Sequence, residues 1–362
     1  MIKYLGSKRT LIPALLEILR SLPGARSVLD VFSGTARVGH ACKAAGFQVR
    51  ANDHNAYAST LARCYVQADR EHVERDAERL LRELSLLPGR PGYFTETFCI
   101  LSRFFQPQNG ARIDAIREEI ARKCLDPELE AVLLVSLMEA ADRVDSTTGL
   151  QMAYLKSWAP RAYNDLELRL PKVLPCAHHG KGEAYQMDAL EFVDAVASCE
   201  VDVAYLDPPY NQHKYLGNYH IWETLILWDK PAVYGRACKR VDCRERTSVF
   251  NSKPQFTAAF AELVRRVKAR WLVVSFSDEG YLDRTTAEAI LGQRGQVRVV
   301  EHDYKRYVGA QIGIYNPSGE KVGAVSHLRN TEYVYVVGES ELTERSRAYQ
   351  GRRKPQQVTL FE

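Results

Sequence analysis

A short apolar strand that runs directly into two prolines constrains this chain more than any other feature. Residues 201–219 read VDVAYLDPPYNQHKYLGNY. The alternating valines and the following Ala-Tyr-Leu predict a buried strand over residues 201–206, and the prolines after Asp207 must end it. Because each proline fixes φ and lacks an N–H, the turn is stiff and the carbonyl of Pro208 stays outside any helical hydrogen-bond ladder. Open α/β sheets bind ligands at the carboxyl ends of their strands, so we expect Asp207 in a functional site.

The groups on this turn suit a planar base that carries an amine. Asp207 supplies a carboxylate, Pro208 a fixed carbonyl and Tyr210 an aromatic ring. Two acceptors can take both hydrogens of the amine while the ring stacks on the base. A strand-ending Asp before Pro-Pro can also be purely structural. The tetrapeptide Asp207-Pro208-Pro209-Tyr210 resembles the catalytic motif of methyltransferases that modify amino groups in nucleic acid, especially DNA adenine-N6 methyltransferases.

The composition is that of an ordinary globular protein. The 362 residues are 46% hydrophobic and 26% charged, enough for one large domain or two smaller ones. A net charge of +4 does not by itself indicate a nucleic-acid partner. Eight cysteines without paired spacing fit reduced thiols better than a disulfide framework. Glu17 interrupts the first apolar run and no stretch reaches membrane-spanning length, so we expect a cytoplasmic protein, of a prokaryotic cell or its phage.

Two strand ends near the amino terminus predict a nucleotide-like ligand. Residues 27–39, SVLDVFSGTARVG, read as a strand, a turn and the start of a helix, in which Gly34 allows close backbone approach and Thr35 is expected to help cap the helix. Residues 47–55 predict a second strand that ends at Asp53, 19 positions after Gly34. An acid there commonly accepts from ribose hydroxyls, although an Asn-Asp turn is the alternative. The missing G-x-G-x-x-G pattern disfavours a nicotinamide enzyme.

These segments also resemble the Dam-like, alpha-group DNA adenine methyltransferases, with one departure. Tyr4, Gly6, Ser7 and Lys8 resemble the N-terminal motif that contacts S-adenosylmethionine, in which the lysine would meet the carboxylate of the cofactor; solvated charges before a helix are the alternative. The family usually has a further glycine where this chain has Ala36.

Asp188 resembles the third cofactor acid of the family, near the adenine of the cofactor, and a simple helix N-cap is an equal alternative. The resemblance implies S-adenosylmethionine as cofactor and no metal ion. The implied cofactor residues are Tyr4, Gly6, Ser7, Lys8, Asp30, Phe32, Ser33, Gly34, Thr35, Asp53, Asp188 and Asp207, and the implied catalytic residues are Asp207, Pro208, Pro209 and Tyr210.

A long insertion separates the two halves of the expected sheet. Residues 69–87, 111–123 and 128–144 have helical patterns, and the region is too long for a simple crossover. We therefore expect an α/β fold: a Rossmann-like class I methyltransferase sheet with a mostly helical target-recognition subdomain inserted. The expected parts are a catalytic domain (1–66 and 176–338), the insertion (67–175) and a flexible tail (339–362). With 15 basic and 18 acidic residues, the insertion is not a basic clamp.

Basic residues concentrate after the catalytic turn. Residues 230–270 hold 11 Lys plus Arg against 3 Asp plus Glu, and residues 235–253 show no helix period, which predicts a flexible basic loop beside the catalytic strand. Residues 142–161 resemble the A-Y-L-K-x-W segment of the FokI-type modification methylases, with a surface turn as the alternative. The expected phosphate contacts are Lys156, Arg236, Lys239, Arg240, Arg244, Arg246 and Lys253. Tyr219 and His220 are expected either in the base pocket or in the core.

The carboxyl-terminal part predicts the closing strands and a docking peptide. Residues 271–277, 297–308 and 333–337 read as strands. In the tail, Gln357, Leu360 and Phe361 resemble the Q-x-x-L-F peptide that docks on bacterial sliding clamps, although a chance match or a tail that folds back is the stronger alternative.

The whole pattern predicts a site-specific DNA methyltransferase that modifies adenine N6 in double-stranded DNA. Its expected setting is restriction-modification or host or phage modification, with a cognate endonuclease as a candidate partner. Cytosine-N4 methylation, an RNA substrate and a non-catalytic S-adenosylmethionine- or DNA-binding protein are the alternatives.

Overall fold

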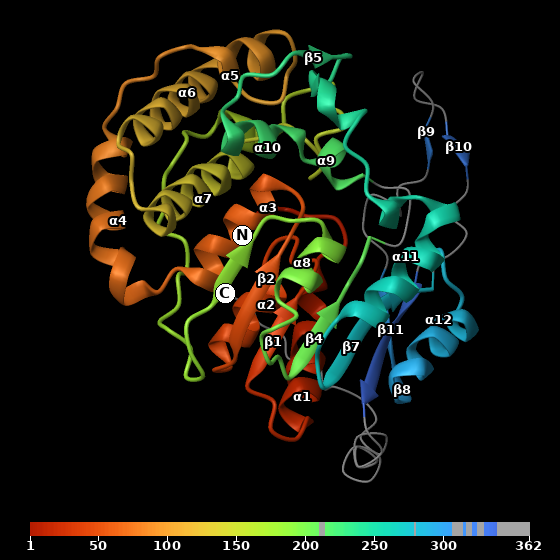
Figure 1. Cartoon of the computed structure of the whole chain (residues 1–362). Helices are drawn as coiled ribbons and strands as arrows, with labels where there is room; N and C mark the ends of the chain where they lie inside the picture. Colours follow the sequence, from red (N-terminus) through yellow and green to blue (C-terminus); the bar gives the residue numbers. More distant parts are fainter. Residues whose placement is uncertain (210–213, 279, 306–313, 316–320, 324–328, 339–362) are drawn as a thin grey trace.

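A computed structural model describes residues 1–209, 214–278, 280–305, 314–315, 321–323 and 329–338 (Figure 1). A central sheet fills the lower part of this view, and a helical layer lies above it, at the end toward which the parallel strands run. Among the described residues, no helix is long and apolar enough to cross a bilayer. Tyr210 and the tail from residue 339 lie outside the described residues.

The sheet has seven strands and is mostly parallel, which confirms the predicted Rossmann-like class. Only β11 runs antiparallel to its two neighbours, β7 and β8. It enters the sheet between them although it follows both in sequence. The strands in spatial order are β3 (Glu183–Tyr185), β2 (Gln48–Asn52), β1 (Ser27–Asp30), β4 (Val203–Leu206), β7 (Trp271–Ser277), β11 (Arg329–Gly338) and β8 (Gln296–Lys305).

The register brings three acidic residues to one edge of the sheet. Asp30 ends β1 and pairs with Ala51 of β2 on one side and with Tyr205 of β4 on the other. Asp53 follows β2 by one residue and Asp207 follows β4 directly. Since parallel strands end at the same edge, all three side chains emerge together, as the sequence predicted.

Both faces of the sheet are covered by apolar side chains, which explains why its strands read as continuous apolar runs. On one face, the core contains α1 (Ile12–Ser21), α2 (Arg37–Ala44) and α3 (Ala56–Ala62). The other face carries α8 (Ala189–Ala195), α11 (Lys253–Arg266) and α12 (Arg284–Leu291). Successive strand residues alternate between these two cores: Val273 belongs to the first, and Leu272 and Val274 to the second.

The insertion is helical, as predicted. Its main helices are α4 (Arg70–Ser85), α6 (Pro107–Arg122) and α7 (Pro127–Arg143), with the single turn α5 (Tyr93–Thr95) before α6. The helix α10 (His220–Leu227), which follows the turn at residues 207–209 and α9, lies in the same layer (Figure 1). Arg117 of α6 fixes it there by donating to the carbonyls of Leu225 and Ile226 at 2.8 and 2.9 Å. The helical layer is therefore built from both sides of the catalytic strand, beyond residues 67–175.

A buried ion pair holds the start of the insertion against the sheet domain. Lys43 in the last turn of α2 donates to a carboxylate oxygen of Asp69 and to the carbonyl of Ala68, both at 2.7 Å. The two charged side chains are 1% and 2% exposed. Since a buried charge needs a partner, each of these side chains depends on the other.

The basic segment after α10 is folded, so the prediction of an irregular, flexible loop was wrong. A short hairpin joins β5 (Val233–Tyr234) to β6 (Lys239–Arg240), and two turns of 3₁₀ helix follow, η5 (Val241–Cys243) and η6 (Val249–Asn251). Two-residue strands carry too little periodicity to be recognised from the sequence. The predicted strand over residues 297–308 is β8, and residues 306–308 lie outside the described residues.

Candidate active site

A pocket opens at the carboxyl ends of β1, β2 and β4. The amino-terminal segment, the turn after β1 and the short helix α9 (Tyr215–Asn218) contribute to its wall. All the cofactor residues predicted from the sequence line it, together with Pro208 and Pro209 of the catalytic turn. The sequence analysis missed other lining residues, including Arg37, Asn52, Tyr205, Tyr215, Phe250 and Asn251.

Asp30 is a buried carboxylate that faces this pocket. It is 1% exposed, and within the described part of the chain neither of its oxygens has a hydrogen-bond partner. Burial, with smaller contributions from the negative charges of Asp207 and Asp53, raises its pKa to about 8, although the nearby backbone N–H of Gly39 lowers it. The hydroxyl of Ser33, also in the pocket wall, is buried without a partner among the same residues. Such groups are costly unless a ligand supplies donors or positive charge.

Asp53 ties the turn after β1 to the end of β2. One of its oxygens accepts from the backbone N–H of Gly34 at 3.0 Å, and the other accepts from that of Asn55 at 3.0 Å. Burial raises the pKa of Asp53, although both backbone hydrogen bonds lower it. The predicted alternatives for Asp53 are thus compatible, because it forms a local turn and also lines the pocket.

The turn after β1 uses two residues with positive φ. Gly34 has a φ of 52° and Ala36 a φ of 57°. A Cβ at Gly34 would lie 3.4 Å from the ring of Tyr4. The helix α2 begins after Ala36 without a side-chain cap, so the prediction that Thr35 caps it was wrong. Ala36 holds the left-handed conformation that a glycine would adopt more easily.

Stacked tyrosines join the amino-terminal segment to α9. The ring of Tyr4 stacks on Tyr215 and Tyr219, with centroid distances of 5.2 and 4.7 Å. Tyr219 is 1% exposed and its hydroxyl accepts from the backbone N–H of Leu5 at 2.6 Å. His220 is fully buried and burial lowers its pKa to about 3. Of the two predicted locations for Tyr219 and His220, the structure shows the core.

Asp188 caps a helix, which was one of its two predicted roles, and it also faces the pocket. Its carboxylate accepts from the backbone N–H of Leu190 at 2.8 Å and caps α8. The same residue lines the pocket. A helix cap can therefore present its remaining acceptor capacity to a ligand.

Asp207 lies beside a lysine that it shares with a second carboxylate. The ammonium of Lys8 is 3.1 Å from Oδ1 of Asp207 and also contacts Glu332 of β11. The sequence did not indicate these two acidic partners of Lys8, which also lines the pocket. Burial raises the pKa of Asp207 to about 6, Lys8 lowers it and Glu332 raises it. The sequence placed Glu332 in a segment, residues 330–333, that resembles the terminal segment of the Dam-like methyltransferases, but it assigned no site role to this residue.

Comparison with known proteins shows the family of the chain. Residues 4–275 match the family of D12 class N6 adenine-specific DNA methyltransferases. The chain belongs to this family. It is therefore an enzyme that methylates adenine N6 in DNA, as the sequence predicted, which favours adenine over cytosine as the target.

Several relatives of the D12 family are type II enzymes. The type II methyltransferase M.NlaIII of Neisseria lactamica is 29% identical over 345 residues, 92% of this chain and 97% of the relative. M.FokI of Planomicrobium okeanokoites is 29% identical over 330 residues, 84% of this chain but only 49% of the relative. M.CviAII of Paramecium bursaria Chlorella virus 1 is 25% identical over 315 residues, 84% of this chain and 92% of the relative.

For this D12 enzyme, two arginines predicted to contact DNA are already paired inside the protein. Arg240 is 3% exposed and its guanidinium forms ion pairs with Asp229 and Asp242. It therefore supports the hairpin and is not available to a phosphate. Arg246 pairs with the buried Glu223 at 2.7 Å and lines the pocket. A count of charges along the sequence could not reveal these acidic partners.

The other predicted DNA contacts are more accessible. Lys156, Arg236, Arg244 and Lys253 are exposed and Lys239 is half-buried. The guanidinium of Arg244 lies over the ring of Tyr234, 3.8 Å from its centroid. A similar stack, which the sequence did not indicate, places Arg103 over Trp158 at 4.8 Å while it donates to the carbonyl of Lys156 at 3.1 Å.

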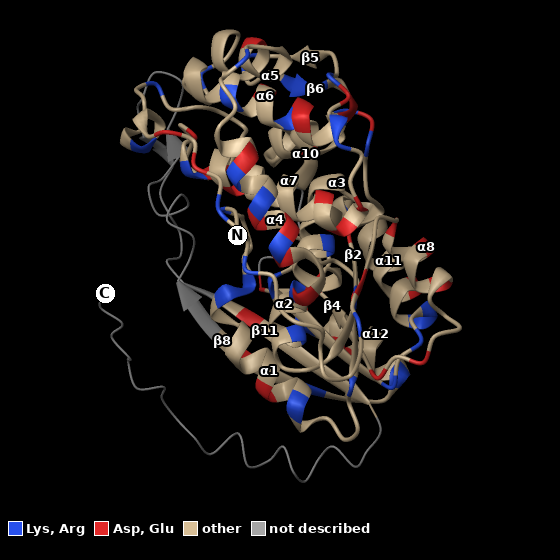
Figure 2. Ribbon diagram, turned by 90° about the vertical axis from the view of Figure 1, so that its left-hand side faces the viewer, with Lys and Arg blue, Asp and Glu red and all other residues tan. Residues whose placement is uncertain are grey.

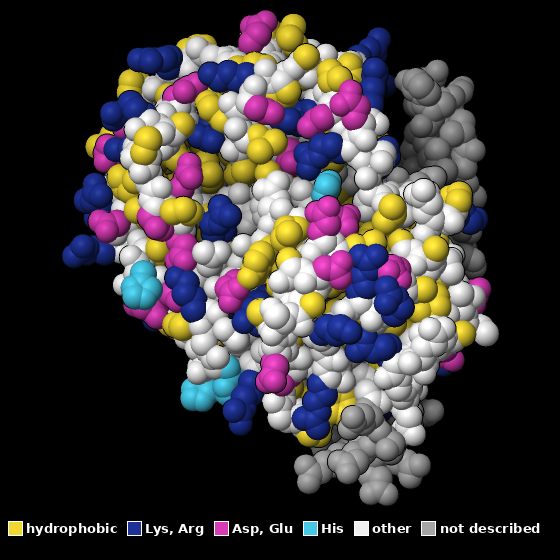
Figure 3. All heavy atoms as spheres, viewed as in Figure 1, with side chains coloured by type: hydrophobic (Ala, Val, Ile, Leu, Met, Phe, Trp, Pro, Cys, Tyr) yellow, Lys and Arg dark blue, Asp and Glu magenta, His cyan; other side chains and the backbone are white. Residues whose placement is uncertain are grey.

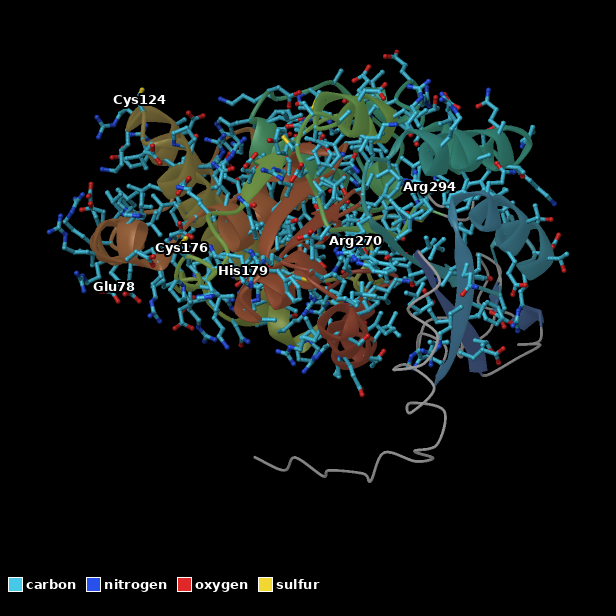
Figure 4. The ribbon with its side chains drawn as sticks, turned by 60° about the horizontal axis from the view of Figure 1, so that its bottom comes forward. Glu78, Cys124, Cys176, His179, Arg270 and Arg294 are labelled. Carbon is cyan, nitrogen blue, oxygen red and sulfur yellow. The ribbon has the colours of Figure 1, made fainter. Side chains whose placement is uncertain are left out.

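Basic and acidic residues alternate on the surfaces that the figures show. Blue and red ribbon segments are intermixed over the helical layer in Figure 2, and dark blue and magenta side chains are intermixed on the face shown in Figure 3. Arg270, the last residue of the basic region, directly precedes β7 and so lies at the edge of the sheet opposite the pocket. There its side chain donates to the carbonyl of Pro23 (Figure 4). Arg294, near the same edge, donates to three backbone carbonyls. The net charge of residues 230–270 therefore overstates the charge near the site.

Proposed function

We propose that the pocket binds S-adenosylmethionine and that the Asp207 turn holds the amino group of an adenine extruded from duplex DNA. The observation that carries this proposal is the meeting of Asp30, Asp53 and Asp207 at adjacent strand ends, with the Pro208 carbonyl beside them. A cofactor pocket and a base-binding turn then share one wall, as methyl transfer requires.

The unpartnered groups of the pocket fit this cofactor. S-adenosylmethionine carries positive charge and several hydrogen-bond donors, which Asp30 and Ser33 lack among the described residues. Asp53 lies where an acid accepts from ribose hydroxyls, and Asp188 supplies an acceptor on the next strand-helix turn. When bound, S-adenosylmethionine supplies an electrophilic methyl group. The chain supplies the acceptors that orient it.

The catalytic turn acts by positioning and electrostatics. The lone pair of an adenine amine is delocalised into the ring, which makes the amine a poor nucleophile. Asp207 and the carbonyl of Pro208 accept its two hydrogens, and this favours a pyramidal nitrogen with a freer lone pair. We assign Tyr210, which lies outside the described residues, to stacking on the extruded base. Asp207 must be ionised for this role, so activity is expected to fall as the pH drops below its pKa of about 6.

DNA contacts are assigned to accessible and half-buried cations of the helical layer, the β5–β6 hairpin and the start of α11. Lys156, Arg236, Lys239, Arg244 and Lys253 remain the proposed phosphate contacts, and Arg103 joins them because its stack on Trp158 holds the guanidinium in place. The helical insertion is the proposed target-recognition part. Arg240 is not part of this set, because its guanidinium is paired with Asp229. Arg246 lines the pocket.

Product analysis tests the proposed function. The purified chain is incubated with duplex DNA and S-adenosylmethionine, the DNA is digested to nucleosides, and the methylated nucleoside is identified. We expect N6-methyladenine and weak competition by RNA. N4-methylcytosine, or no methyl transfer to any duplex, would contradict the proposal. Sequencing of modified bases in DNA from cells that express the chain then gives the target sequence.

A role in restriction-modification, with a cognate endonuclease as partner, is supported by the type II relatives.

We also propose that Gln357, Leu360 and Phe361, outside the described residues, dock on a sliding clamp. A titration of a labelled tail peptide with clamp, followed by fluorescence anisotropy, checks it. The absence of a saturable signal would remove this partner.

Replacing Gly34 with alanine is expected to weaken S-adenosylmethionine binding about tenfold, because an alanine in the left-handed conformation of this pocket turn costs roughly 1–2 kcal/mol. Isothermal titration calorimetry measures the dissociation constant. Ala36→Gly is the matched control, since it relieves the same conformation two residues away and should not weaken binding. Equal binding by Gly34→Ala and the wild type would contradict the close approach at this turn.

Replacing Asp30 with asparagine is expected to stabilise the unliganded protein at alkaline pH and to weaken its binding of S-adenosylmethionine. The folded pKa of about 8 lies above the ordinary value of 3.8, so the folded state binds more protons and wild-type stability falls as the pH rises between these values. The gain from Asp30→Asn should therefore shrink as the pH is lowered. Urea unfolding at about pH 5 and about pH 8.5 measures it. A gain that is independent of pH would contradict this assignment.

A further inference from the structure

One ammonium group serves two buried carboxylates in this structure. Lys8 begins the 3₁₀ helix η1 (Lys8–Thr10), Asp207 follows β4 and Glu332 lies in β11. The lysine contacts both acids, at 3.1 Å from Oδ1 of Asp207. The three side chains are 10%, 17% and 5% exposed, respectively. The cluster is largely shielded from water, so its charges interact strongly.

Glu332 is held rigidly at this place. The hydroxyl of Ser275 in β7 donates to its carboxylate. Its backbone pairs with Ser277 of β7 on one side and with His302 of β8 on the other. Glu332 lies outside residues 4–275, which match the family. Once Glu332 is buried it needs a cationic partner, but an apolar residue at this position would fill the same space and need none, so packing alone does not explain the pair.

We propose that Glu332 is a positioning residue for methyl transfer: it holds the ammonium of Lys8 against one oxygen of Asp207, which leaves the other oxygen to accept from the amine of the substrate. This inference rests on the proposed role of Asp207. A carboxylate with both oxygens free could rotate away from the amine. A lysine fixed on the far side by Glu332 prevents that rotation and costs no reorganisation when the base arrives.

Glu332 also sets the strength of Asp207 as an acceptor. Lys8 alone would lower the pKa of Asp207. Glu332 offsets this effect, because its negative charge interacts with the same ammonium group. The other groups that act on Asp207 are Asp30 of β1, Tyr205 of β4 and Tyr215 of α9. With the cluster complete, Asp207 is charged at neutral pH and still accepts strongly, the condition that favours proton-accepting groups in catalysis.

The test is the pH dependence of single-turnover methylation by Glu332→Gln. We expect the acid limb of the rate profile to move down by about half a unit to one unit, because the charge that opposes Lys8 is gone. The rate near neutral pH should fall about tenfold, because Asp207 becomes a weaker acceptor. Glu332→Asp keeps the charge and should keep the acid limb near the wild-type position. Thermal unfolding of each variant shows that it is folded.

Lys8→Met provides a second arm that does not depend on the behaviour of Glu332→Gln. Removing the cation should move the acid limb up by about one unit or more. If the acid limb stays in place in either folded variant, Glu332 only packs the sheet and the inference is overturned. Absence of methyl transfer by the wild type would instead contradict the proposed function, so the two failures are distinguishable.

Discussion

Replacing Asp207 with asparagine will lower the rate of methyl transfer by about two to four orders of magnitude while the protein stays folded. Asparagine keeps the volume of the side chain but removes the negative charge that faces Lys8, and its NH₂ group cannot accept from an amine. Single-turnover transfer of labelled methyl groups to duplex DNA measures the loss. Asp207→Ala should lose at least as much.

The control for this variant is Asp194→Asn, which removes an exposed carboxylate of α8 that pairs with Arg266. It should leave the rate unchanged. Calorimetric titration with S-adenosylmethionine shows whether Asp207→Asn still has its cofactor pocket. A variant that binds cofactor, unfolds normally and turns over at a near-normal rate would refute the role assigned to Asp207.

Replacing Lys43 with methionine will lower the free energy of unfolding by about 3–5 kcal/mol. The change leaves Asp69 charged at 2% exposure and takes away the donor to the carbonyl of Ala68. Urea unfolding followed by circular dichroism measures the loss. The effect is large because Asp69 is too deeply buried for water to solvate the charge that loses its partner.

Two further variants show whether the loss of stability comes from leaving a buried charge unpaired or only from breaking an ion pair. Arg122→Ala breaks an ion pair with Glu119 on α6, but the arginine is 71% exposed, so its cost should stay below about 1 kcal/mol. The double variant Lys43→Met/Asp69→Leu removes both charges and should recover most of the lost stability. A cost for Lys43→Met as small as that for Arg122→Ala would show that the pair is not buried in solution.

The sequence predicted those parts of the site that depend on local pattern. Apolar runs ended by Asp30 and by Asp207-Pro208 marked strand ends, and parallel strands must bring such ends together. The helices of the insertion followed from their periodicity. In contrast, the place of β11 between β7 and β8 depends on pairing between distant segments, which no local pattern specifies.

Charged side chains were the least predictable, because their partners are distant in sequence. Lys8 and Glu332 meet across nearly the whole chain. Arg240 was predicted to contact DNA, although its guanidinium forms ion pairs with Asp229 and Asp242. Thr35 was expected to cap α2, but the backbone turns through a left-handed Ala36 instead. In each case the sequence showed the residue type and the fold decided its role.

The late entry of β11 into the middle of the sheet sets an order for biosynthesis. The ribosome must synthesise residues 329–338 before β11 can pair with β7 and before Glu332 can contact Lys8. A nascent or truncated chain that ends near residue 275 would carry the whole family-matched segment but not Glu332, so Lys8 would keep only Asp207 of its two carboxylates. With the proposed role of Glu332, unfinished copies of the enzyme would methylate DNA slowly.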